Sequence, residues 1–88
     1  MKVVIHERAH KHHLSDEEIM YAFSTRFIAT AGRKRDADHY PPRFAGIGVD
    51  NNGREIELVW VQLADGSILI FHANWATKQF KRELEEAK

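Results

Sequence analysis

The sequence predicts an α+β domain in which a short strand and two N-terminal helices precede a curved antiparallel sheet of about four strands, and a further helix ends the chain. Three observations support this prediction. Alternating apolar residues, typical of strands, fill most of the second half; Asn-Gly and Asp-Gly pairs separate these runs; and polar segments with helical composition flank them. The helices are expected on one face of the sheet. Eighty-eight residues supply one core, so residues 1–88 are expected to form a single domain.

The N-terminal part begins with "KVVI" (residues 2–5), which has the composition of a short strand. The following "HERAHKHH" (residues 6–13) has helix-compatible composition and holds four of the six histidines of the chain. The pattern Ser-Asp-Glu-Glu then predicts a capping box, in which Ser15 accepts from the Glu18 amide while the Glu18 side chain reaches back. A second helix is therefore expected from about Asp16.

The middle of the chain combines one strand with a long polar loop. "RFIAT" (residues 26–30) has strand composition, and the glycine and prolines of residues 31–42 mark an irregular stretch. Basic side chains concentrate here, which makes a substrate-contacting loop plausible. They are Arg33, Lys34, Arg35 and Arg43.

The second half reads as a three-stranded meander followed by a helix. Strands are expected over residues 43–50, 54–63 and 67–73, because the turns "NNG" and "ADG" supply residues that tolerate the positive φ of tight hairpins. Apolar residues occupy both faces of the middle strand, which predicts a central position in the sheet. Residues 76–88 are expected to form the C-terminal helix.

Composition indicates a globular chain, with 43% hydrophobic and 30% charged residues, and its apolar runs are too short to cross a bilayer. The chain lacks cysteine, and its N-terminus has no signal-peptide core, so we expect a cytoplasmic protein without membrane partners. The net charge is zero. Any basic site must therefore be a local patch.

Three segments carry a resemblance to a known family. "KHHLSDEEIMYAF" resembles the helix pair of the BrnT toxins, "AGIGVDNNGREIELVWVQL" resembles their hairpin, and "LIFHANWATKQFKREL" is similar to their last strand and helix. The similarity runs from about Ile5 to about Leu84. It implies a RelE-like fold and the role of toxin in a type II toxin–antitoxin pair.

Such a toxin cleaves RNA without a metal or cofactor and is neutralised by a small DNA-binding antitoxin, a ribbon-helix-helix protein in the BrnT case. Carried over by position, the basic helix residues of the family fall on His10 and Lys11, and its strand end falls on residues 72–74. Asn74 stands where the family has an arginine. The resemblance thus implies that phosphate binding passes to Lys78 or Arg43, or is lost.

Metal-independent RNA cleavage needs a base, an acid and cations for the phosphate. Histidine can serve as acid or base near neutrality, and His72 at the polar end of the last strand, His10 and His6 are the catalytic candidates. On a helix His6, His10 and His13 would share a face, while His12 would point elsewhere. The proposed phosphate or RNA contacts are Lys11, Arg33, Arg35, Arg43 and Lys78, and Trp75 could stack on a base or meet a partner.

Other interpretations remain open at the level of sequence. The histidine-rich segment could be a solvated helix face, or it could bind a metal through histidines four residues apart, although no matching ligand set follows. His72 could be a core residue. The alternative function is a non-catalytic protein-binding module, a toxin whose chemistry has decayed.

Overall fold

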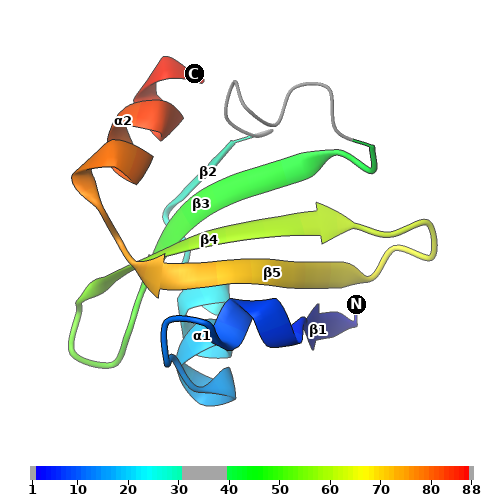
Figure 1. Cartoon of the computed structure of the whole chain (residues 1–88), viewed down its shortest axis with the longest axis horizontal. Coiled ribbons are helices and arrows are strands. Elements are labelled where there is room, and N and C mark those ends of the chain that lie inside the picture. Colours follow the sequence, from blue (N-terminus) through cyan, green and yellow to red (C-terminus); the bar gives the residue numbers. More distant parts are fainter. Residues whose placement is uncertain (1, 31–39, 88) are drawn as a thin grey trace.

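The computed structural model describes residues 2–30 and 40–87, and its strands form one five-stranded sheet in the order β1-β5-β4-β3-β2 (Figure 1). The elements in chain order are β1 (Val3–Ile5), the short 3-10 helix η1 (Glu7–His10), α1 (Asp16–Ser24), β2 (Ile28–Thr30), β3 (Arg43–Val49), β4 (Glu55–Gln62), β5 (Ile68–Trp75) and α2 (Lys78–Glu86).

The sheet is mixed, so the prediction of about four antiparallel strands is wrong. β2 to β5 pair antiparallel with their neighbours, but β1 lies parallel to β5, with Val3 opposite Ile68 and Ile5 opposite Ile70. β1 pairs with β5, the last strand of the meander, because β2 occupies the opposite edge of the sheet. A strand predicted from composition alone carries no information about this long-range partner.

The prediction of two N-terminal helices is also wrong. In the part of the chain that the structure describes, one α-helix, α1, precedes the meander, and the histidine-rich segment forms only the four-residue η1. Its buried residue is Ala9, so the segment has little apolar surface with which to hold a longer helix against the sheet. The turn ends before His13, whose backbone φ of 67° lies in the left-handed region.

Helix α1 begins with the predicted capping box, which is confirmed. The Ser15 hydroxyl accepts from the Glu18 amide at 3.1 Å, and the Glu18 carboxylate accepts from the Ser15 amide at 2.9 Å. Its buried face then packs on β3, where Gly48 allows the closest approach. A Cβ at this glycine would overlap the backbone of Ala22, so the helix–sheet distance depends on a residue without a side chain.

The two helices α1 and α2 cover opposite faces of the sheet, so the expectation that the helices lie on one face is wrong. One cluster joins α1 to Leu58 and Trp60 of β4, and a second joins Phe80 and Leu84 of α2 to Val59 and its neighbours. Adjacent residues of β4 therefore serve different cores, which follows from the alternation of side chains along a strand. β4 is central, as predicted.

The hairpin turns and an irregularity in the pairing of β4 with β5 are the remaining local features of the sheet. Gly53 and Gly66 take φ values of 80° and 87° in the two hairpin turns, as the Asn-Gly and Asp-Gly pairs predict. An irregularity in the β4–β5 pairing leaves Phe71 between the paired residues Ile70 and His72, so both Phe71 and His72 turn towards the α2 side. Within residues 2–30 and 40–87, no helix has the length and apolar character needed to cross a membrane.

Candidate active site

A buried carboxylate at the centre of the sheet organises the site. Glu57 lies in β4 with a side chain only 6% exposed, on the face covered by α2. Its Oε2 receives a hydrogen bond from His72 Nε2 at 2.7 Å. Its Oε1 accepts from the amide and the hydroxyl of Thr77 at 2.9 and 3.0 Å. Both oxygens are thus satisfied by partners from β5 and from the start of α2.

These partners keep Glu57 ionised. Burial acts to raise its pKa, but the hydrogen bonds from His72 and Thr77 outweigh that effect and leave the pKa below its ordinary value. Because an ionised carboxylate only accepts hydrogen bonds, Nε2 of His72 must carry the proton of their shared bond. The other ring nitrogen, Nδ1, makes no hydrogen bond to any residue that the structure describes.

His72 stands between two other rings. It stacks on Phe80 of α2 with ring centroids 6.3 Å apart, and the ring of His12 meets it edge-on at 5.8 Å. His12 follows η1, which lies along β5 beyond the end of β1. The His72 side chain remains 32% exposed. The imidazoles of His12 and His72 therefore lie together at a partly exposed position, and the Glu57 carboxylate holds the His72 ring.

A basic groove adjoins this pair. It is a shallow, open groove of about 330 Å³, lined by His6, Arg8, Tyr40, Arg43 and Phe71, with apolar residues of β4 and β5 as its floor. Phe71 is the neighbour of His72, and the Arg43 guanidinium lies 4.9 Å from the Phe71 ring centroid. No Asp or Glu appears among the described residues of this lining. The groove therefore suits an anion that also carries flat rings.

The predicted site residues separate into two groups. His72 lies at the imidazole pair, and His6 and Arg43 line the groove beside it. His10 is engaged elsewhere, because its Nδ1 lies 2.9 Å from the Leu14 carbonyl oxygen and its Nε2 lies 2.8 Å from Asp16.

The other predicted site residues that the structure describes are not part of the His12–His72 pair or of the groove beside it. Lys11 caps η1 and is exposed, and Lys78 is the exposed first residue of α2. Trp75 packs with the core on the α1 side and carries the Arg54 guanidinium 3.7 Å from its ring centroid, so it is not in the groove. Arg33 and Arg35 lie outside the described residues.

Sequence reasoning missed Glu57, His12, Arg8 and Tyr40. The partner of Glu57 could have been expected from the sequence, because Glu57 occupies the same strand face as Val59 and Val61. A carboxylate buried on such an apolar face needs a hydrogen-bond partner. An α-helical period would point His12 away from the other histidines, but the segment forms a 3-10 turn.

No group of three or more His, Cys, Asp or Glu side chains with metal-binding geometry occurs among residues 2–30 and 40–87. No protein-family model matches the chain, and no curated protein or solved structure matches it either.

Proposed function

We propose that this protein is a metal-independent endoribonuclease that cleaves single-stranded RNA and acts as the toxin of a type II toxin–antitoxin system. The observation that carries the chemistry is the His12–His72 pair, with His72 bound to the buried Glu57. The toxin role rests on the resemblance to the BrnT toxins. Its partner would be a small DNA-binding antitoxin.

In this reaction His72 is the base. With Nε2 donating to Glu57, the lone pair of Nδ1 takes the proton of a 2′-hydroxyl, whose oxygen then attacks the adjacent phosphorus. The bond from phosphorus to the 5′-oxygen breaks, and protonated His12 supplies a proton to the leaving oxygen. The products are a 2′,3′-cyclic phosphate and a 5′-hydroxyl, which balances the protons within the pair.

The groove supplies binding. Arg8 and Arg43 provide the positive charge for the phosphates, and His6 adds charge when protonated. The Tyr40 side chain is 91% exposed at the groove wall and offers a ring for base stacking. Asn74 cannot replace the arginine of the family, and its side-chain oxygen accepts from the Trp75 amide at 2.8 Å. Phosphate binding is therefore assigned to the two groove arginines.

The test is incubation of the purified protein with a long single-stranded RNA in a chelator. His72→Ala and His12→Ala are compared with His13→Asn, a matched control that removes a neighbouring imidazole while asparagine tolerates the positive φ. We expect cyclic-phosphate ends from the unmodified chain and the control. Cleavage should fall at least a hundredfold in the two alanine variants, the lower range for general acid–base catalysis.

Intact RNA with every variant would contradict the ribonuclease and favour the non-catalytic binding module. Equal cleavage by all four proteins would indicate a contaminant or a different site. Circular dichroism of each variant shows whether lost cleavage reflects lost folding. For the toxin role, induced synthesis of the unmodified chain should arrest bacterial growth, and His72→Ala should relieve the arrest.

A further inference from the structure

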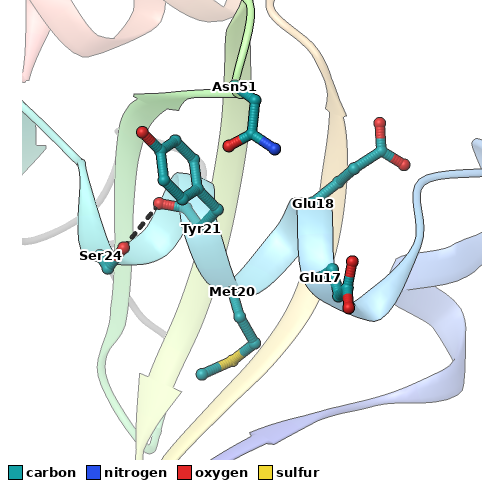
Figure 2. A pocket seen from close by; sticks show the side chains of 6 residues that line it. All are labelled: Glu17, Glu18, Met20, Tyr21, Ser24 and Asn51. Atoms are coloured by element: carbon teal, nitrogen blue, oxygen red, sulfur yellow. Dashed lines mark hydrogen bonds between the residues drawn. The ribbon is translucent and has the colours of Figure 1, made fainter.

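A second hollow lies on the other side of the sheet, between α1 and the turn after β3. It is an open hollow of about 540 Å³, lined by Glu17, Glu18, Met20, Tyr21 and Ser24 of α1 together with Asn51. Figure 2 shows Tyr21 pointing towards Asn51 of the turn after β3, Met20 pointing to the opposite side of the helix, and the two carboxylates further along α1. We call it the α1 groove.

The α1 groove exposes apolar surface that the fold does not use. Met20 and Tyr21 are 38% and 43% exposed, while the buried side of α1 is formed by Ile19, Ala22 and Phe23. Methionine adapts its shape to different contacts, and tyrosine offers a large ring with little entropy to lose. Exposed side chains of these two types are enriched in protein-binding surfaces.

Its charge identifies the kind of occupant. Glu17 forms no hydrogen bond or ion pair with any residue that the structure describes. Glu18 Oε1 accepts the capping-box hydrogen bond from the Ser15 amide. The lining contains no Lys, Arg or His within the described chain, and the α1 sequence itself has none. These carboxylates repel nucleic-acid phosphates and anionic lipid surfaces, so a polypeptide with positive charge is the complementary ligand.

We propose that the α1 groove docks a cationic segment of a protein partner, with Lys or Arg side chains meeting Glu17 and Glu18 and apolar side chains covering Met20 and Tyr21. The volume accommodates a few side chains, so the partner presents a segment rather than a broad face. The inference does not rest on ribonuclease activity, because the α1 groove and the basic groove lie on opposite faces of the sheet.

The test is selection of a displayed random-peptide library on the full chain. Enriched peptides are expected to combine Lys or Arg with a large apolar residue. Their affinity should fall at least tenfold for Glu17→Lys and for Met20→Ala. Glu86→Lys, an exposed acid in the last turn of α2, is the matched charge control and should bind like the unmodified chain.

Amide chemical shifts on peptide addition locate the contact, and they should change along α1 and at Asn51. The proposal is overturned if no peptide is enriched, if enriched peptides are acidic, or if Glu17→Lys binds them unchanged. Shifts confined to another surface would also overturn it. Concentration-dependent self-association that Glu17→Lys abolishes would assign the α1 groove to a second copy of the chain and not to a separate partner.

Discussion

Replacement of Glu57 by alanine should destabilise the protein strongly, although the change removes a charge from the core. Alanine leaves His72 and the amide and hydroxyl of Thr77 without the acceptor that now binds all three. Hydrogen bonds to a charged group are worth about 1.5–3 kcal/mol each, and the burial cost of the carboxylate offsets part of their sum. Since His72 is partly exposed, we expect a loss of about 3 kcal/mol, at the lower end for a broken buried pair.

That loss is a large part of the stability available. At about 0.05–0.15 kcal/mol per residue, 88 residues give roughly 4–13 kcal/mol, and 3 kcal/mol corresponds to a fall in Tm of about 12–24 °C. Chemical and thermal unfolding, followed by tryptophan fluorescence and circular dichroism, measure both quantities. Glu57→Gln keeps an oxygen for Thr77 and should lose only about 1 kcal/mol.

The matched control is Glu55→Ala, two residues away on the same strand. Glu55 pairs with Lys81 at the surface, where the two side chains are 37% and 49% exposed, so its removal should cost about 0.2–1 kcal/mol. If Glu57→Ala loses no more stability than Glu55→Ala, the buried carboxylate does not anchor β5 and α2, and the proposed role of Glu57 in the candidate active site is refuted.

Four further outcomes are expected. Because the pKa of Glu57 is lowered in the folded chain, its stabilising effect is present above the ordinary value of 4.5 and is lost as the pH falls through the lower folded value; Glu57→Gln should remove this part of the acid sensitivity in unfolding measured from pH 7 to pH 3. Gly48→Ala should destabilise by at least about 1–3 kcal/mol, since its Cβ overlaps α1; unchanged unfolding would show that the helix can shift. Ser15→Ala should cost about 1 kcal/mol by the same measurement and Ser15→Asp much less, whereas equal losses would exclude the cap as the cause. With a non-cleavable RNA, the logarithm of the binding constant should fall with the logarithm of salt concentration, and Arg43→Gln should reduce that slope by about 0.7, against no change for Arg82→Gln in α2.

The elements that local chemistry specifies were predictable. The capping box at Ser15 and the glycines at 53 and 66 are encoded by neighbouring residues, and the structure has them where the sequence predicts. The parallel pairing of β1 was not predictable, because it joins residues more than sixty positions apart and depends on which sheet edge is open. The helix expected over residues 6–13 does not form, because polar composition permits a helix without supplying the apolar face that stabilises one.

The candidate active site also combines features that local sequence predicts with features that only the fold determines. His72 was predictable as a polar residue at the end of an apolar strand, but its partners are set by the fold. Glu57 lies opposite Asn74 in the strand register, and the irregularity after Ile70 turns His72 towards Glu57. His12 reaches the site because η1 ends at His10, so that His12 does not continue a helix. A helical projection cannot anticipate either event.

The position of β4 has a consequence for any control by a partner. Its alternate residues face the α1 core and the basic groove, so a segment docked in the α1 groove is separated from the basic groove by the sheet itself. Covering the α1 groove therefore does not cover the basic groove. A partner that docks there and also blocks cleavage must either extend around the β5 edge, where His12 and His72 meet, or displace α1 from its contact with Gly48. The first would cover the basic groove and abolish RNA binding there, whereas the second would leave that groove uncovered. Because any partner that binds the folded chain shifts its unfolding temperature, RNA binding and not Tm distinguishes the two routes.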